Sequence, residues 1–316
     1  MKNRKLLLLM ITVLTILSLA SCGTNTDDSY PSKAIEVIVP FGAGGGSDQF
    51  ARMLESQIEA NTDYELVLVN MPGAATAVGY EYFMSEPADG YTIMIATTDT
   101  IINLSQGITE GNIEDIEGIA VPQLNIDMLF INGDEDRFSN FDELVAYSVE
   151  NNVEITVGTV GIEGSEFLTI SAIEEVTGAK FQLIPYSEPG ERYAALGGGH
   201  IDVLFEQPGD ISAFLESNDY IPIIAMCEER LESFADVPTS VENGINVVNG
   251  YWRAVLVNSE VPDEIKEILR EMIINAIDTD GYKEYAHNKY LDLRDGYYGA
   301  DEVNDFLTTE HEYYLP

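Results

Sequence analysis

The chain has 316 residues and carries 15 basic against 55 acidic side chains, a formal net charge of −40. This balance excludes a nucleic-acid partner, because binding to a phosphate backbone needs a basic surface. Hydrophobic residues make up 45% of the sequence, which indicates a folded chain rather than a disordered one. The length exceeds that of one typical hydrophobic core, so we expect two domains.

The N-terminus has the pattern of an export signal. Three basic residues precede an apolar run over residues 6–19, which is shorter than a membrane span of roughly 20 residues. The run ends in Leu-Ala-Ser-Cys, which resembles a bacterial lipobox. We expect residues 1–22 to be a lipoprotein signal peptide, Cys22 to be lipidated and residues 23–30 to be a tether. The alternative is an ordinary signal peptide with an incidental cysteine.

Export would place the mature protein outside the cytoplasm, held to the membrane only through its lipid anchor. Removing the signal leaves 12 basic residues against 55 acidic ones, a net charge of −43. Cys227 is then the one remaining cysteine, and it follows an apolar run over residues 221–226. We expect a buried, unreactive thiol there rather than a catalytic nucleophile.

The first half of the mature chain alternates between strand and helix patterns. Apolar and β-branched runs predict strands at residues 35–39, 65–69 and 91–96. Apolar residues recur on one helical face over residues 48–59. This β-α-β rhythm predicts an α/β fold with a mostly parallel sheet covered by helices.

A similar unit begins again in the second half. The expected elements are a strand at 153–157, a glycine-bearing turn at 158–164, a helix at 165–176, a strand at 181–184, a helix at 192–196 and a strand at 200–205. A clear amphipathic helix follows Pro262. Both halves therefore open with a strand, a glycine-bearing turn and a helix.

The glycine-rich turn at residues 40–48 is the strongest binding signal. Backbone N–H groups ahead of a helix form an anion site, which the helix dipole reinforces. With the second turn at 158–164, two such sites would face each other across a cleft, suiting a small ligand with negative charge at both ends. Nucleotide binding is disfavoured, because the second strand lacks a terminal acid and no G-K-[ST] motif follows the glycines. We expect no cofactor and no metal.

Several short motifs together resemble the substrate-binding proteins of tripartite tricarboxylate transporters, the Bug receptors. They include Val-Pro-Phe-Gly-Ala-Gly-Gly-Gly-Ser-Asp at 39–48, Pro-Ala-Asp-Gly-Tyr-Thr at 87–92, Ile-Pro-Tyr at 184–186 and Asp-Val-Pro-Thr at 236–239. The resemblance runs in order from Tyr30 to the C-terminus.

The resemblance implies a two-lobed fold of the type II periplasmic-binding-protein class, with the ligand cleft between the lobes. Lobe 1 would hold residues 30–121 and 238–316, and lobe 2 residues 122–237. The implied function is capture of a small carboxylate, such as a di- or tricarboxylate, and its delivery to the membrane subunits of a transporter. The implied receptor is a monomer and not an enzyme.

Carried over by position, the resemblance places ligand contacts in both glycine-bearing turns and at nearby strand ends. The first turn would contribute Phe41, Ala43, Gly44, Ser47 and Asp48, and the second Thr159, Gly161, Gly164 and Ser165. Further candidates are Thr97, Thr98, Asp99, Tyr186, Glu206 and Gln207. Backbone N–H and hydroxyl groups would donate to ligand carboxylates there.

The chain departs from the family pattern in the second turn and after Tyr186, and it has added acidic residues near the expected cleft. These are Asp99, Glu163, Glu166 and Glu188, which either contact a substrate ammonium group or point to solvent. A receptor for an amino acid or another ammonium-bearing solute is therefore the first alternative. An extracellular hydrolase is the second, and a surface interaction protein without solute binding is the third.

Overall fold

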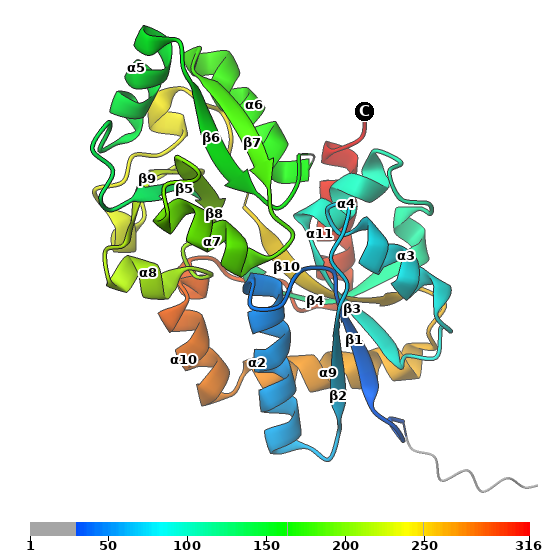
Figure 1. Ribbon diagram of the computed structural model, residues 1–316. Coiled ribbons are helices and arrows are strands. Elements are labelled where there is room, and N and C mark those ends of the chain that lie inside the picture. Colours follow the sequence, from blue (N-terminus) through cyan, green and yellow to red (C-terminus); the bar gives the residue numbers. More distant parts are fainter. Residues whose placement is uncertain (1–29, 163, 249) are drawn as a thin grey trace, which may run out of the picture. The chain divides into compact units, whose positions relative to one another are not determined.

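The computed structural model describes residues 30–162, 164–248 and 250–316 (Figure 1). The predicted signal peptide, the lipidation site Cys22, most of the tether and Glu163 lie outside these residues. Within the described part, Lys33–Pro316 forms one compact unit.

The first sheet has five strands in the order β2-β1-β3-β10-β4. Their bounds are β1 Ile35–Val39, β2 Leu66–Asn70, β3 Thr92–Thr97, β4 Ile116–Leu124 and β10 Trp252–Asn258. Strand β1 pairs in parallel with β2 and β3, whereas β10 runs antiparallel to both of its neighbours. The predicted β-α-β unit is thus confirmed, with one antiparallel strand inserted near the edge.

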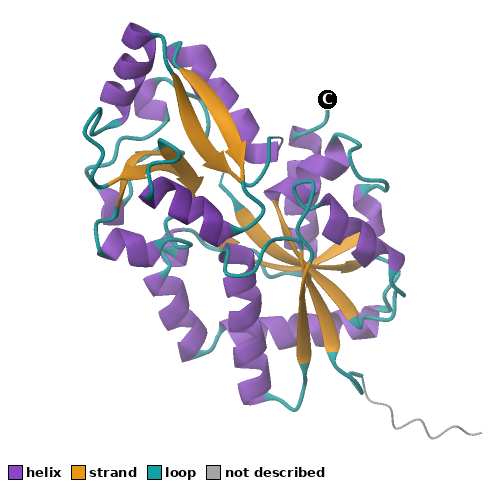
Figure 2. Ribbon diagram, viewed as in Figure 1, coloured by secondary structure: helices purple, strands orange, loops and turns teal. Residues whose placement is uncertain are grey.

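Helices flank this sheet on both sides (Figure 2). They are α2 Gly46–Asn61, α3 Ala77–Ser85, α4 Thr98–Ser105, α9 Asp263–Ile277, α10 Asp280–Asn288 and α11 Ala300–Tyr313. Helix α2 packs against α9, and α4 packs against α11. The C-terminal helices therefore complete the layer of the N-terminal sheet.

The second sheet repeats the same pattern in the order β7-β6-β8-β5-β9. Its elements are β5 Met128–Asn132, α5 Phe141–Asn151, β6 Glu154–Thr159, α6 Gly164–Thr177, β7 Lys180–Pro185, α7 Pro189–Gly197, β8 Val203–Glu206, α8 Ser212–Glu216 and β9 Tyr220–Ala225. Strand β5 is the antiparallel member. Short 3₁₀ turns lie at Ile113–Asp115, Glu232–Phe234, Val241–Asn243 and Leu291–Leu293.

Some boundaries differ from the sequence expectation. Strand β6 extends to Thr159, so Gly158 lies in the strand rather than in the turn. Strand β8 begins at Val203, because the Asp202 side chain bonds to Thr156 of the neighbouring strand and ends the preceding turn. Helix α2 begins at Gly46, two residues earlier than expected.

The chain passes between the two sheets along two adjacent segments. Residues 125–127 lead from β4 into β5, and residues 226–251 return to β10. The backbone N–H of Asn125 donates to the Tyr251 carbonyl oxygen at 2.7 Å, so the two segments lie side by side. Each sheet thus receives its antiparallel strand from one of these passages.

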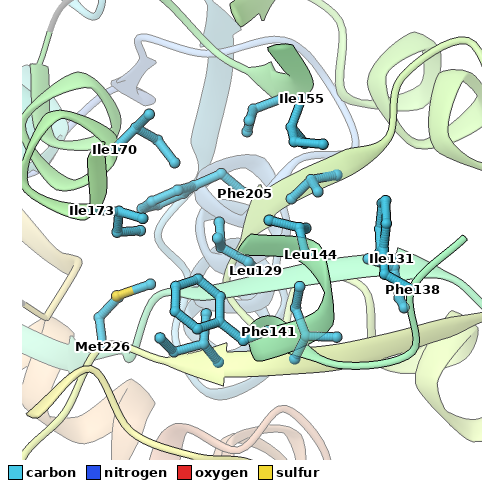
Figure 3. Close-up of a cluster of buried hydrophobic side chains, with 14 of the residues drawn as sticks. Leu129, Ile131, Phe138, Phe141, Leu144, Ile155, Ile170, Ile173, Phe205 and Met226 are labelled. Atoms are coloured by element: carbon cyan, nitrogen blue, oxygen red, sulfur yellow. The ribbon is translucent and has the colours of Figure 1, made fainter. Parts of the chain in front are cut away.

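Each sheet has its own hydrophobic core. Figure 3 shows one core of the second sheet, where Leu129 of β5, Phe141 of α5 and Phe205 of β8 are almost completely buried. In the first sheet, Trp252 of β10 and Phe83 of α3 belong to a separate cluster. Cys227 is a buried free thiol, as expected, and burial raises its pKa.

Candidate functional site

The candidate site is a cavity at the carboxyl ends of parallel strands from both sheets. In open α/β sheets, ligands bind at this edge. The cavity measures about 40 Å³, room for a few water molecules at roughly 10–15 Å³ each. Its lining residues are Phe41, Gly42, Gly45, Gly46, Ser47, Asp99, Val160, Glu166, Tyr186, Ser187, Pro189, Arg192, Glu206, Gln207, Asp210, Tyr251 and Arg253.

Six of the residues predicted from the sequence line this cavity. They are Phe41, Ser47, Asp99, Tyr186, Glu206 and Gln207. They come from the ends of β1, β3, β7 and β8 and from the start of α2. Val160 of the second turn also lines the cavity, so the two glycine-bearing turns meet at one place in the fold.

The other predicted residues do not line the cavity, and several have defined structural contacts. Ala43 and Gly44 are exposed. The Asp48 carboxylate accepts hydrogen bonds from the Gly44 N–H and from Arg52, which helps to hold its pKa below the ordinary value despite partial burial. Asp48 thus stabilises the first turn of α2.

The remaining predicted residues lie at strand ends around the cavity. Thr97 ends β3, and the Thr98 hydroxyl accepts the Trp252 N–H at 3.3 Å. The Thr159 hydroxyl donates to the Gly161 carbonyl oxygen at 2.6 Å. These contacts fix the turns that follow β3 and β6. Gly164 and Ser165 begin α6 and lie against Asp99.

Arg253 connects the two sheets at the cavity and was not predicted from the sequence. Its guanidinium donates to Asp210 at 2.5 Å and to Gln207 at 3.2 Å, both after β8. It also donates to Ser47 at 3.3 Å, at the start of α2. The side chain is 2% exposed, so this contact set is shielded from water. The sequence signal that could have identified Arg253 is a charged residue within the apolar run of β10.

Gly46 allows this ion pair to lie against the first turn of α2. A β-carbon at Gly46 would stand 1.9 Å from Asp210 Oδ2 and 2.0 Å from Arg253 Nη2. Gly46 and Ser47 also line the cavity, and the first N–H groups of a helix have no intrahelical acceptor. The N-terminus of α2 is therefore a donor surface for an anion.

On the opposite side, the chain supplies its own carboxylate to the N-terminus of α6. Asp99 Oδ1 accepts both the backbone N–H and the hydroxyl of Ser165 at 3.0 Å. Asp99 Oδ2 accepts the Tyr251 hydroxyl at 3.2 Å. Gly164, with φ at +83°, leaves space for the Asp99 carboxylate, because a β-carbon at position 164 would lie 2.5 Å from Oδ1.

Glu166 occupies the other backbone donors of the second turn. Its Oε2 accepts the N–H groups of Val160 at 2.8 Å and of Gly161 at 3.4 Å. Its Oε1 lies 3.8 Å from Arg192 Nη1. Burial raises the pKa of Glu166 to about 8, although the nearby guanidinium acts in the opposite direction.

Arg192 is the second guanidinium of the site. It is 4% exposed, and its Nη2 donates to Glu206, which also accepts the Tyr193 hydroxyl at 3.0 Å. Its Nε and Nη1 have no hydrogen-bond acceptor among the described residues. Two buried donors are therefore left beside the cavity.

A further buried carboxylate, Asp127, lies behind the cavity in the passage between the sheets. It is 1% exposed and accepts the Gln207 side-chain N–H at 2.7 Å. Burial raises its pKa to about 8, and the neighbouring Asp99 and Glu206 act in the same direction. Burial also raises the pKa of Asp99 and of Glu206.

Within the described ranges, no group of three or more His, Cys, Asp or Glu side chains is placed to hold a metal ion. Among the helices of that same part of the chain, none is long and apolar enough to cross a membrane.

Comparison with solved structures shows the fold. The superposition with BugD, a periplasmic binding protein, covers 90% of this chain and 96% of that chain, with a TM-score of 0.81 and 20% identity. It also matches MatC from Rhodopseudomonas palustris with bound malate, with a TM-score of 0.80, 18% identity and coverage of 90% and 98%. The expected type II periplasmic-binding-protein fold is confirmed.

Sequence comparison shows the family. The chain is 24% identical over 255 residues to the protein BugT of Bordetella pertussis, which covers 79% of this chain and 78% of BugT. The model of the tripartite tricarboxylate transporter family receptor matches residues 50–311. The resemblance noted in the sequence is thereby confirmed: this chain belongs to the tripartite tricarboxylate transporter receptor family.

Proposed function

We propose that this protein is an exported, lipid-anchored receptor that captures a small carboxylate and delivers it to the membrane subunits of a tripartite tricarboxylate transporter. Membership of the receptor family supports delivery to such a transporter. The malate bound to MatC supports a carboxylate ligand.

The observation that carries the proposal is the donor surface around the cavity. The N-terminus of α2, the Ser47 hydroxyl and the unpaired N–H groups of Arg192 all lie at its lining. Such groups together recognise a carboxylate by charge-assisted hydrogen bonds. An acidic protein can bind an anion this way, because the site is formed by local dipoles and guanidinium groups.

The described cavity is narrow, at about 40 Å³. The passages at residues 125–127 and 226–251 are the connections about which the two predicted lobes would rotate. We propose that the described arrangement represents the closed form, and that the lobes open to admit the solute.

A thermal-shift screen of small carboxylates tests the function. Ligand at one hundred times its Kd adds roughly 2.7 kcal/mol of stability, so a true ligand raises the Tm by several degrees. Ser47→Ala should weaken that ligand about two- to twelvefold, as expected for roughly 0.5–1.5 kcal/mol per hydrogen bond. The exposed Ser217→Ala is the matched control. A folded protein that no carboxylate stabilises would refute the proposal.

Lipidation of Cys22 has a separate test. Mass spectrometry of the mature protein should find an acylated Cys22 as the first residue, and Cys22→Ala should move the protein out of the membrane fraction. A mature protein that begins elsewhere, or that carries a free Cys22 thiol, would contradict the anchor and leave the binding role unaffected.

The hydrolase alternative is not supported, because the family consists of binding proteins, not enzymes. One serine does contact a histidine: Ser105 Oγ lies 2.8 Å from His311 Nδ1. That hydroxyl also donates to the Ile101 carbonyl oxygen at 2.7 Å, within its own helix. Ser105 does not line the cavity, so this contact is structural.

A further inference from the structure

The ligand's second end is specified by acidic side chains of this chain. Taking the proposed function as its basis, we propose that the site selects a solute with a carboxylate at one end and an ammonium group at the other, and that Asp99 sets this preference. Asp99 takes the place that the second carboxylate of a dicarboxylate would occupy.

Several donors of the second turn and of the N-terminus of α6 are already used. The Asp99 carboxylate accepts the N–H and the hydroxyl of Ser165, and Tyr251 donates to its other oxygen. Glu166 accepts the N–H groups of Val160 and Gly161. A ligand carboxylate would therefore meet two fixed carboxylates here, which already accept the donors of Val160, Gly161 and Ser165.

Asp99 has no ion-pair partner among the described residues. It is 4% exposed and belongs to none of the ion pairs among the described residues. Its acidic neighbours Asp127 and Glu166 have guanidinium groups acting on them, Arg253 on Asp127 and Arg192 on Glu166, whereas none forms an ion pair with Asp99 among the described residues. A buried charge is costly without a partner, and a ligand ammonium group would provide one.

The charge around the cavity leads to the same conclusion. Four carboxylates line it against two guanidinium groups, a formal net charge of −2, which the raised pKa values of Asp99, Glu166 and Glu206 make less negative. These are Asp99, Glu166, Glu206 and Asp210 against Arg192 and Arg253. A dicarboxylate would bring this to −4, whereas a ligand with one carboxylate and one ammonium group would leave it unchanged. Like charges brought together in a shielded site repel strongly.

The other end of the ligand has an independent recognition element. Arg192 is almost fully buried beside the cavity, and its Nε and Nη1 lack acceptors among the described residues. Unpaired buried donors are costly, and a ligand carboxylate oxygen would satisfy one of them. Together with the N-terminus of α2, Arg192 defines one anion position and Asp99 one cation position.

Isothermal titration with length-matched pairs of probes tests this assignment. Each pair differs only in replacing one carboxylate by CH₂–NH₃⁺: succinate with 4-aminobutyrate, glutarate with 5-aminopentanoate, and adipate with 6-aminohexanoate. In the best-binding pair, the wild type should bind the amino acid at least tenfold more tightly than the dicarboxylate.

The variant Asp99→Asn isolates the charge, because its amide oxygen still accepts the Ser165 donors. It should reduce the tenfold preference to twofold or less. The exposed Asp63→Asn should leave the preference unchanged. Glu166→Gln provides a second test if Asp99→Asn fails to fold, and should also lower the preference.

The outcomes separate the two proposals. Equal or tighter binding of dicarboxylates by the wild type, or an unchanged preference in Asp99→Asn, overturns the role of Asp99 while leaving the carboxylate receptor intact. Absence of binding by every probe and every other carboxylate, in protein shown to be folded, overturns both.

Discussion

At the scale of single residues, the absence of a side chain matters as much as its presence. Gly46 lies against the ion pair between Asp210 and Arg253, and that pair joins β10 to the segment after β8. The sequence pattern indicates Gly46 only as part of a flexible turn. A glycine is required at position 46 because of Arg253, which lies more than two hundred residues later in the chain.

Gly46→Ala should lower the Tm and weaken ligand binding, because its β-carbon would displace a buried ion pair. Breaking such a pair costs about 3–5 kcal/mol. The control is Gly190→Ala, a first-turn position of α7 with no atom within 4 Å of the added carbon. The control should be neutral or slightly stabilising, by up to about 1 kcal/mol. Equal Tm values for the two variants would contradict this account.

Asp127 should make the stability depend on pH. Its pKa in the folded protein is about 8, because burial disfavours the ionised form. The folded state therefore holds a proton between pH 4 and 8 that the unfolded state releases, and the contribution of this group to stability falls as the pH rises through that range.

Asp127→Asn should remove this contribution, because the amide oxygen still accepts the Gln207 donor but does not ionise. Thermal unfolding at several pH values measures the effect. The Tm of the variant relative to the wild type should increase from pH 4.5 to pH 8. A constant difference would show that Asp127 does not titrate in this range.

At the scale of elements, the sequence pattern was sufficient to predict a strand where the strand is apolar and a glycine-bearing turn follows it. Strand β1 was predicted with its observed bounds, Ile35–Val39, and the expected amphipathic helix is α9. Strands β4, β5, β9 and β10 were missed. Strand β4 contains Gly118 and Pro122, and β10 contains Arg253, so neither has a pattern typical of a central strand.

In the candidate site too, some residues could be predicted from the local sequence and others could not. Turns close to a strand end, such as residues 40–48, could be predicted because the glycines are adjacent in sequence. Arg192 of helix α7, Arg253 of strand β10 and Tyr251, just before β10, reach the cavity only through tertiary packing. No local pattern contains that information, although a charge within an apolar run was a usable signal.

The C-terminal helix α11 is an integral part of the first sheet's layer. Its Val303 lies against Gly118 of β4, and Leu307 is 2% exposed. Leu307→Ala should therefore cost about 2–5 kcal/mol in urea-induced unfolding. The control Leu315→Ala, at a position 51% exposed, should change the stability by less than about 0.5 kcal/mol. Similar values for both would show that α11 is not packed on β4.

At the scale of the whole molecule, the net charge of −40 does not decide the ligand. Two sheets of the same strand order place their carboxyl ends around one cavity, and the charges there are arranged locally. The N-terminus of α2 and Arg192 present donors, whereas Asp99 and Glu166 present acceptors. The molecule therefore offers opposite recognition groups to the two ends of a small solute.

A crystal structure of the protein with its best-binding solute would locate both ends of the ligand. We expect the solute in the cavity between the two sheets, with its carboxylate bonded to the Gly46–Ser47 turn and Arg192 and its ammonium group within 4 Å of Asp99. A solute bound elsewhere, or a carboxylate bonded to the Ser165 N–H in place of Asp99, would contradict this expectation.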